Sequence, residues 1–308
     1  MQIYQTALIT GATSGIGRAF AGALAAQGSN LILTGRRQAL LEQTAAGLRA
    51  QYGVQVTVLP AELSDERDIC RIEALIRATQ LDLLVNNAGF GLRGCFQDGP
   101  LEPYLQMERV HIGCTVRLTY AALEQMCARD SGAIINVASD AAYMIVPANA
   151  FYSGTKAFIK QFSEGLYLDL RGRGSHVRVQ ALCPGLTRTD FQLKMGMPKG
   201  KQRNRGVMRW QEPETVAARS LRCLERGRPV CHCGGAMGIA ERVLCVFMPL
   251  LLPAGSALVS CSAGRLIWKL RFPGILTVTQ SLNGVRISSI LNPTDHTAGG
   301  DFKWVKRY

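Results

Sequence analysis

The amino-acid sequence predicts an α/β fold with a doubly wound parallel sheet. Short apolar, β-prone segments alternate with segments of helical spacing through the first 235 residues, and a glycine-rich turn directly follows the first apolar segment. Strands that are apolar along their whole length suit a parallel sheet covered by helices on both faces. We therefore expect a single domain over residues 3–235, followed by a C-terminal helical extension.

The segments expected to be strands are short and apolar, and they are Thr6–Thr10, Asn30–Thr34, Val54–Leu59, Leu81–Asn86, Ala133–Ala138 and Val177–Leu182. The segments between them place apolar residues at helical spacing, and they are Ile16–Gln27, Ala39–Gln51, Asp65–Thr79, Leu101–Arg129 and Phe151–Arg171. With 308 residues, of which 47% are hydrophobic, the chain can bury one large core.

The turn after the first strand predicts a dinucleotide site. It contains Gly11, Gly15 and Gly17 and leads into a helix, so its backbone can approach a pyrophosphate at the helix N-terminus. This order of strand, turn and helix is typical of the Rossmann fold.

The end of the second strand predicts which dinucleotide binds. Arg36 and Arg37 stand where an acidic residue would accept a hydrogen bond from an unmodified ribose 2′-hydroxyl. Two guanidinium groups can instead form charge-assisted hydrogen bonds with a 2′-phosphate. NADP(H) is therefore the expected cofactor, in preference to NAD(H).

Three later residues predict the chemistry. Tyr152 and Lys156 are four residues apart and share one face of a helix, and Ser139 precedes the tyrosine by thirteen residues. We expect the ammonium to lower the pKa of the phenol from its reference value of about 10 towards neutrality. The phenol would then be a usable proton donor or acceptor, and the serine hydroxyl would hold the reacting oxygen.

Together these motifs resemble the short-chain dehydrogenase/reductase superfamily, in the branch with a TGxxxGxG turn and a YxxxK pair. The resemblance runs to about residue 235, and it includes Asn86-Asn87-Ala88-Gly89 and the segment from Pro184 to Thr189. It implies that the cofactor contacts Gly11, Ser14, Gly15, Ile16, Gly17, Arg36, Arg37, Glu62, Leu63, Asn87, Ala88, Gly89, Tyr152, Lys156, Pro184, Gly185, Thr187 and Thr189.

Two positions depart from the family pattern. Glu62 stands where the family usually has aspartate, and we expect this change to affect only contacts with the adenine. His111 stands where an asparagine normally completes a water-linked proton relay. Two interpretations of His111 remain open: the imidazole exchanges protons in place of the asparagine, or it fills space and the relay is impaired.

The sequence thus predicts an NADP(H)-dependent oxidoreductase that interconverts a carbonyl and a secondary alcohol. Its candidate catalytic residues are Ser139, Tyr152, Lys156 and His111. The apolar extension favours a lipophilic or acyl substrate. The alternative function is a cofactor-binding scaffold or sensor with little turnover. The resemblance also implies a homo-oligomer, unless the C-terminal tail blocks or replaces the usual interface.

The composition excludes several other classes. No nucleic-acid motif accompanies the net charge of +13, so we assign the charge to a phosphorylated cofactor or an anionic surface. The N-terminus lacks a basic-then-apolar signal peptide, and we expect a cytoplasmic protein with reduced thiols. Cys231-His232-Cys233 lacks a second ligand pair at zinc-finger spacing, so no metal site is expected.

The remaining segments leave alternatives open. Lys194–Arg209 carries six basic residues and no acid, which indicates either a solvated loop or a lid over the active site. Residues 236–272 are expected to form an apolar and basic helical extension, and residues 273–308 a weakly patterned tail. Within the extension, Val243–Gly264 has no charge but contains breaking prolines, and Arg265–Phe272 interleaves cations with large apolar residues, as interfacial helices do. The extension would either contact a membrane surface peripherally through residues 243–272 or pack over a pocket or subunit interface.

Overall fold

The computed structural model describes residues 4–92, 94–143, 148–195, 202–204 and 209–233, together with the backbone of four later strands. The chain divides into two compact units, Met1–Cys245 and Val246–Tyr308. The expected boundary at residues 235 and 236 lies outside the described residues, as does most of the basic segment Lys194–Arg209.

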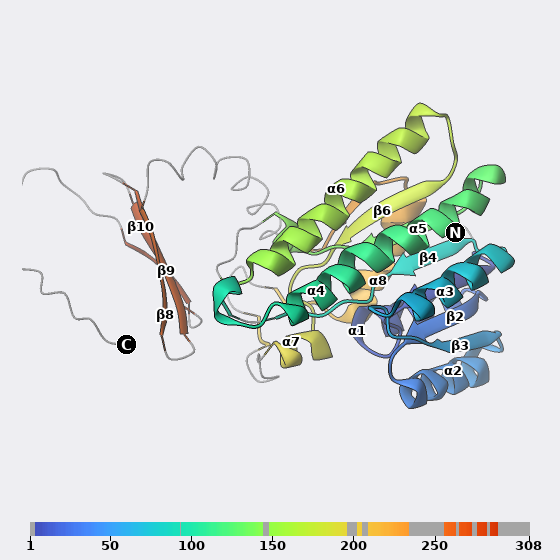
Figure 1. Cartoon of the computed structure of the whole chain (residues 1–308), viewed down its shortest axis with the longest axis horizontal. Coiled ribbons are helices and arrows are strands. Elements are labelled where there is room, and N and C mark those ends of the chain that lie inside the picture. The colour runs from blue at the N-terminus through green and yellow to red at the C-terminus, as the bar shows by residue number, and fades with distance from the viewer. Residues whose placement is uncertain are drawn as a thin grey trace, which may run out of the picture. The chain divides into compact units, whose positions relative to one another are not determined.

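The first unit contains a seven-stranded sheet whose paired strands are all parallel (Figure 1). The strand order is β3-β2-β1-β4-β5-β6-β7, so the chain reverses its direction of progress across the sheet after β3. The strands are β1 (Thr6–Thr10), β2 (Asn30–Gly35), β3 (Val56–Pro60), β4 (Leu83–Asn86), β5 (Ala133–Val137), β6 (Arg178–Cys183) and β7 (Val230–His232).

Helices connect these strands. The α-helices are α1 (Gly15–Ala25), α2 (Gln38–Tyr52), α3 (Glu66–Ala78), α4 (Glu102–Glu108), α5 (Cys114–Ala128), α6 (Ala150–Gly172), α7 (Asp190–Lys194) and α8 (Pro213–Glu225). Two short 3₁₀ turns, η1 (Phe96–Asp98) and η3 (Asp140–Ala142), and one π-helical turn, η2 (Arg109–Gly113), complete the described helical elements.

Both faces of the sheet are covered. Successive side chains of β1 belong to two different hydrophobic cores, because neighbouring side chains of a strand point to opposite faces of the sheet. Ile9 packs with residues of α1, α2 and α8, whereas Leu8 packs with residues of α3, α5 and α6. Figure 1 shows α5 and α6 lying across one face of the sheet. The doubly wound α/β fold is confirmed, and the reason is the one that the continuous apolar strands indicated.

In the first unit, the predicted elements agree with the structure except inside one long helix. Strand β1 has the expected bounds, and the ends of the other predicted strands and helices shift by at most two residues. The expected helix Leu101–Arg129 is instead α4, the π turn η2 and α5. Helical spacing alone does not show such a turn, because a single i→i+5 turn inserts one residue without breaking the apolar face.

The second unit corrects the expected helical extension. It contains an antiparallel sheet in the order β11-β10-β9-β8, formed by β8 (Ser256–Ser262), β9 (Arg265–Phe272), β10 (Leu276–Ser281) and β11 (Gly284–Ser288). The prediction of helix was therefore wrong for Ser256–Ser262 and Arg265–Phe272. The physical reason is the period: from Trp268 to Phe272, large apolar residues and cations alternate, and a period of two is typical of a strand.

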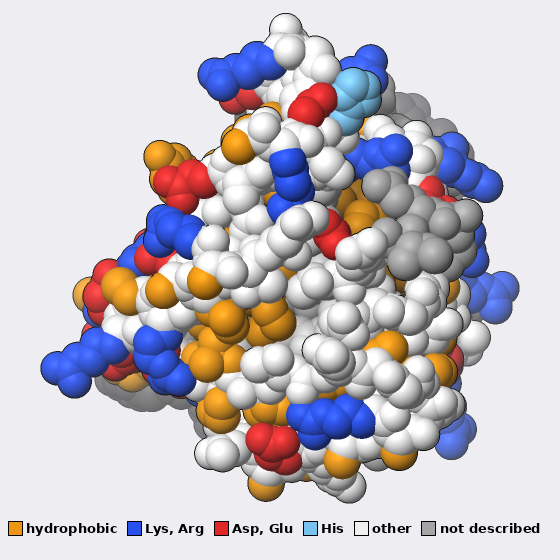
Figure 2. Space-filling model, turned by 90° about the vertical axis from the view of Figure 1, so that its right-hand side faces the viewer, with side chains coloured by type: hydrophobic (Ala, Val, Ile, Leu, Met, Phe, Trp, Pro, Cys, Tyr) orange, Lys and Arg blue, Asp and Glu red, His pale blue; other side chains and the backbone are white. Residues whose placement is uncertain are grey.

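This correction removes the basis for an interfacial helix at Arg265–Phe272. Residues 243–255 lie outside the described residues. Among the helices that the structure describes, none combines the length and the hydropathy that a membrane span requires. On the face shown in Figure 2, the Lys and Arg side chains are spread singly or in small groups, several beside acidic side chains, and do not form one continuous basic field.

Candidate functional site

A pocket lies where the loops after β1, β4, β5 and β6 meet, at the carboxyl ends of these strands. Ligands of open α/β sheets bind at this edge, where the strand order reverses. The pocket is lined by most of the residues named from the sequence: Gly11, Ser14, Gly15, Ile16, Arg36, Arg37, Glu62, Leu63, Asn87, Ala88, Gly89, Ser139, Tyr152, Lys156, Pro184, Gly185, Thr187 and Thr189. Gly17 and His111 are absent from this lining.

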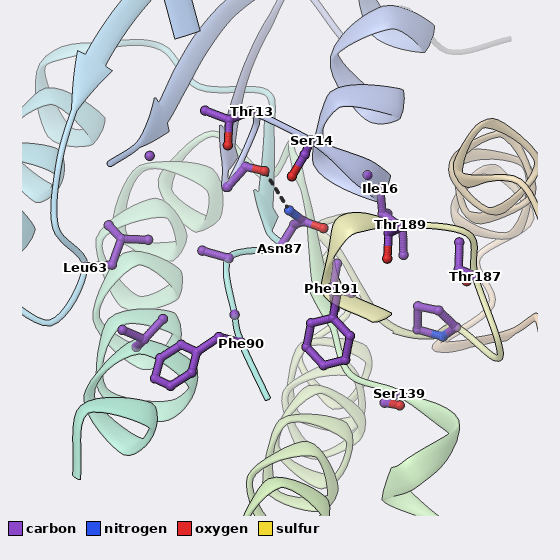
Figure 3. A pocket seen from close by; sticks show the side chains of 18 of the residues that line it. Thr13, Ser14, Ile16, Leu63, Asn87, Phe90, Ser139, Thr187, Thr189 and Phe191 are labelled. Carbon is purple, nitrogen blue, oxygen red and sulfur yellow. Dashed lines mark hydrogen bonds between the residues drawn. The ribbon is translucent and has the colours of Figure 1, made fainter. Parts of the chain in front are cut away.

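The glycine turn is shaped by close backbone packing. Gly11 and Gly15 have φ angles of +68° and +55°, in the left-handed region that favours glycine. A Cβ atom on Gly11 would lie 2.9 Å from Ala88 Cα, and one on Gly17 would overlap the Gly11 carbonyl and the Asn87 amide. The Asn87 side chain points towards this turn (Figure 3), and its Nδ2 donates to Thr10 O at 2.9 Å and to Gly11 O at 3.3 Å. Gly17 therefore packs against the Gly11 carbonyl and the Asn87 amide, and it does not line the pocket.

Two guanidinium groups lie at one end of the pocket. Arg37 Nη2 donates to Thr13 Oγ1 at 2.6 Å and to Ser14 Oγ at 3.2 Å, so this side chain is tied to the glycine turn. Arg36 Nη1 forms an exposed ion pair with Glu62 Oε2 at 3.3 Å. Glu62 also accepts hydrogen bonds from Ser64, which fixes its carboxylate beside Arg36. Both arginines thus reach the same pocket edge from the end of β2.

The three residues expected to perform the chemistry face the same pocket. Ser139 follows β5, and its Oγ accepts a hydrogen bond from Ala141 N at 3.1 Å. Tyr152 and Lys156 are one turn apart near the start of α6. Lys156 Nζ donates to Val137 O at 2.8 Å, which directs the ammonium to the end of β5, and it lies 5.7 Å from the centroid of the Tyr152 ring.

The ionisation of this pair differs from our expectation. Burial raises the pKa of Tyr152 to about 12, and a hydrogen bond with Ser139 opposes this shift. Burial lowers the pKa of Lys156 to about 8. The expected lowering of the phenol pKa by the ammonium was therefore wrong for this structure. Both groups lose solvation in the pocket, and the ammonium lies towards the ring and the Val137 carbonyl.

His111 lies beside the pocket wall and is fully buried. It stands in the π turn η2, and its ring contacts the rings of Phe90 and Tyr152, with centroids 5.7 and 5.8 Å away. Burial is the main cause that lowers the pKa of His111 well below its usual value, and the charge of Lys156 acts in the same direction. The imidazole is therefore neutral near pH 7.

Several lining residues were not predicted from the sequence. Phe90 follows the Asn-Asn-Ala-Gly segment, and Phe191 and Gln192 follow Thr189 in α7. The Phe191 ring lies 5.7 Å from the Tyr152 ring, and Figure 3 shows it in the space between Asn87 and Ser139. The available sequence signal was position, because each aromatic residue closely follows a motif that borders the cofactor.

Comparison with known proteins assigns the family. Residues 5–199 match the model of the short chain dehydrogenase family. The chain therefore belongs to the short-chain dehydrogenase/reductase family, whose members are oxidoreductases that use nicotinamide cofactors.

Individual relatives show how far the likeness extends. The chain is 34% identical over 183 residues to a very-long-chain 3-oxoacyl-CoA reductase of Anas platyrhynchos, which covers 58% of each protein. It spans a little more than half the length of the first curated relatives that it matches. A short-chain dehydrogenase of Sphingobium yanoikuyae, solved with NADPH, has a TM-score of 0.71 and 28% identity over 80% of this chain and 95% of that one.

A family member of Burkholderia phymatum was solved with NAD. Its structure has a TM-score of 0.68 at 24% identity, over 81% of this chain and 96% of that chain, a likeness that shows the fold alone. Structures similar to this one thus hold either form of the cofactor.

Proposed function

We propose that this protein is an NADP(H)-dependent oxidoreductase that interconverts a carbonyl and a secondary alcohol, with Tyr152 as the acid/base residue. One observation carries the proposal: Ser139, Tyr152 and Lys156 face the same pocket as the glycine turn. Each residue type is common, but at the carboxyl edge of the sheet these residues place a proton donor in the same pocket as a turn that can bind a dinucleotide.

The chain offers a fitting site for the dinucleotide. A Cβ on Gly11 would fill the close approach between the turn and Ala88, which supports the need for glycine there. Ser14 and Ile16 would lie along the pyrophosphate, Leu63 by the adenine, and Asn87 to Gly89 along the adenosine ribose. The loop from Pro184 to Thr189 would hold the carboxamide.

The chemical step then divides between cofactor and protein. When bound, the reduced nicotinamide ring supplies a hydride to the carbonyl carbon of the substrate. The Ser139 hydroxyl donates a hydrogen bond to the carbonyl oxygen, and Tyr152 gives that oxygen its phenolic proton, so the product is an alcohol. Lys156, whose Nζ lies at the end of β5, would hold the ribose hydroxyls of the nicotinamide half.

The ionisation of the site favours reduction over oxidation. A phenol with a pKa of about 12 is protonated at neutral pH, so Tyr152 carries the proton that carbonyl reduction needs. Oxidation of an alcohol would start from the tyrosinate, which burial disfavours. We therefore propose that the resting site, with its phenol protonated, is ready for carbonyl reduction at neutral pH.

The preference for NADP(H) rests on the two arginines. Arg36 and Arg37 both line the pocket at the end of β2, and Arg37 is held in place by Thr13 and Ser14. A 2′-phosphate between them would receive charge-assisted hydrogen bonds from two sides. The ion pair with Glu62 leaves Arg36 more than half exposed, so its guanidinium can turn towards such a phosphate.

The substrate is proposed to be lipophilic. Phe90 and Phe191 line the same pocket as Ser139 and Tyr152, and aromatic faces beside the reacting groups favour apolar substituents on the carbonyl. An acyl or ring ketone fits this description. A cytoplasmic location and a homo-oligomer remain predictions of the sequence, for which cell fractionation and light scattering are the direct measurements.

The experiment is a reductase assay with a matched pair of variants. The purified protein is mixed with NADPH and a panel of aliphatic, aromatic and alicyclic ketones, and NADPH absorbance is followed. Tyr152→Phe should lower kcat by at least about 100-fold, because general acid catalysis contributes about 10²–10⁴-fold. Its Kd for NADPH should stay within about twofold, since the Tyr152 hydroxyl is one contact among the many that the pocket offers the cofactor.

Tyr120→Phe is the control, because Tyr120 is exposed and lies outside the pocket. It should keep the wild-type rate. Turnover by Tyr152→Phe comparable with that of the Tyr120→Phe control would remove Tyr152 from the proposed role.

A further inference from the structure

His111 forms two hydrogen bonds that join separate parts of the site. Its Nε2 atom is 3.0 Å from the Phe90 amide nitrogen, in the loop after β4. Its Nδ1 atom is 2.9 Å from Thr155 Oγ1, in the first turns of α6. Thr155 Oγ1 in turn donates to the carbonyl oxygen of Tyr152 at 2.8 Å. The imidazole therefore lies between the main chain of Phe90, in the loop after β4, and the main chain of Tyr152.

The partners fix where the imidazole proton must be. The Phe90 amide can only donate, so Nε2 must accept with its lone pair. The Thr155 hydroxyl spends its one proton on the Tyr152 carbonyl, so its oxygen must accept from Nδ1. Both bonds are satisfied only by a neutral ring with its proton on Nδ1. A second proton on Nε2 would face the Phe90 N–H and break the first bond.

The surroundings hold the ring in this form. His111 is fully buried, and a Cβ on Gly89 would lie 2.8 Å from its Nε2, so the loop packs directly on the ring. The titratable groups that face the ring are Tyr152 and Lys156, both from α6. The loop after β4 contributes the uncharged Phe90, and on the π turn itself Arg109 is paired with Glu102.

We propose that His111 is a positioning residue: as the neutral Nδ1–H tautomer it ties the Phe90 main chain, through Thr155, to the turn of α6 that carries Tyr152. The inference rests on the proposed function, because it is the reductase site that is positioned. It goes beyond the two interpretations that the sequence left open. With both ring nitrogens engaged, the imidazole has no free site for proton exchange, and it does more than fill space.

The first test reads the tautomer directly and needs no turnover. The full-length protein is labelled with ¹⁵N-histidine, and the His111 signals are identified by replacing the other three histidines one at a time. The expected result is a proton on Nδ1 alone, unchanged between about pH 5.5 and pH 8. A proton on Nε2, or titration of the ring within this range, would overturn the proposal even if no substrate is ever found.

The second test reads the positioning. Thr155→Val keeps the shape of the side chain but removes the acceptor for Nδ1–H, whereas Thr155→Ser retains the hydroxyl. The Val variant should lower kcat about tenfold or more, because a buried donor is left unpaired and the Tyr152 turn loses its tie. The Ser variant should stay within about threefold of the wild type. The acid limb of the pH–rate profile should keep its position in all three proteins.

Three outcomes contradict the positioning role. The first is a shifted acid limb of the pH–rate profile in Thr155→Val, which would mark His111 as a proton carrier. The second is an equal kcat in Thr155→Val and the wild type. The third is an equal loss of kcat in the Val and Ser variants. If the wild type reduces no carbonyl while the tautomer is as expected, then the proposed function fails and the structural link of His111 stands.

Discussion

Arg36 offers the sharpest test of cofactor preference, because its side chain reaches the pocket without holding the glycine turn. Arg37, by contrast, donates to Thr13 and Ser14, so its removal would disturb the turn for either cofactor. We therefore choose Arg36→Gln, which removes the charge and retains a polar side chain, and Arg36→Asp, which adds a charge that repels phosphate.

The magnitude follows from what Arg36 contacts in the structure. Its ion pair with Glu62 is 3.3 Å long, and the two side chains are 59% and 35% exposed. Exposed pairs contribute about 0–1 kcal/mol, so the variant should fold normally. A charge-assisted hydrogen bond to a 2′-phosphate contributes about 1.5–3 kcal/mol, which corresponds to about 10- to 150-fold in Kd. Arg36→Gln should weaken NADPH binding by this factor and leave NADH binding unchanged.

The assay is a pair of binding titrations and a pair of initial-rate series, with NADPH and with NADH, at one ketone concentration. Arg77→Gln is the matched control, because Arg77 is also half exposed and ion-paired, with Glu124 at 2.8 Å, but lies outside the pocket. Arg36→Asp should reverse the preference. The reasoning is refuted if the wild type binds both cofactors equally, or if the Arg36 and Arg77 variants behave alike.

Two further predictions concern the turn and the buried lysine. Gly17→Ala should weaken the binding of NADPH and of NADH alike and lower Tm, because its Cβ would overlap the Gly11 carbonyl and over-packing costs about 1–3 kcal/mol. Gly22→Ala, in the same helix but with open space around it, is the control and should not lower Tm. A Gly17→Ala protein with normal Tm and normal cofactor affinity would contradict the packing argument. Burial lowers the pKa of Lys156 from 10.5 to about 8. Between about pH 8 and pH 10.5 the unfolded chain therefore binds more protons at this residue than the folded chain does. The contribution of Lys156 to the free energy of unfolding should consequently rise with pH over this range. Urea titrations of the wild type and Lys156→Met should show this rise, roughly 3 kcal/mol in all, in the wild type only, and parallel curves would disprove it.

The local elements of the first unit could be read from the sequence because each is encoded by its own residues. Apolar strands such as β1 are buried on both faces, and the glycine turn needs backbone angles that other residues rarely adopt. Ser139, Tyr152 and Lys156 were identifiable because their spacing places them on adjoining elements of one fold. The second unit was misjudged because a segment that mixes cations and large apolar residues fits an interfacial helix or a strand, and pairing partners decide between them.

The order of strands and helices in the first unit, the glycine turn and the candidate reacting residues Ser139, Tyr152 and Lys156 could thus be read from the sequence itself, since they depend on side-chain periodicity, on spacing and on conformations specific to glycine. Three properties were decided only by tertiary structure: the raised pKa of the Tyr152 phenol, the π turn in the long helical segment, and the fixed orientation of His111 between Phe90 and Thr155. Each depends on burial or on a hydrogen-bond partner from a distant part of the chain, and such partners meet only when the chain has folded.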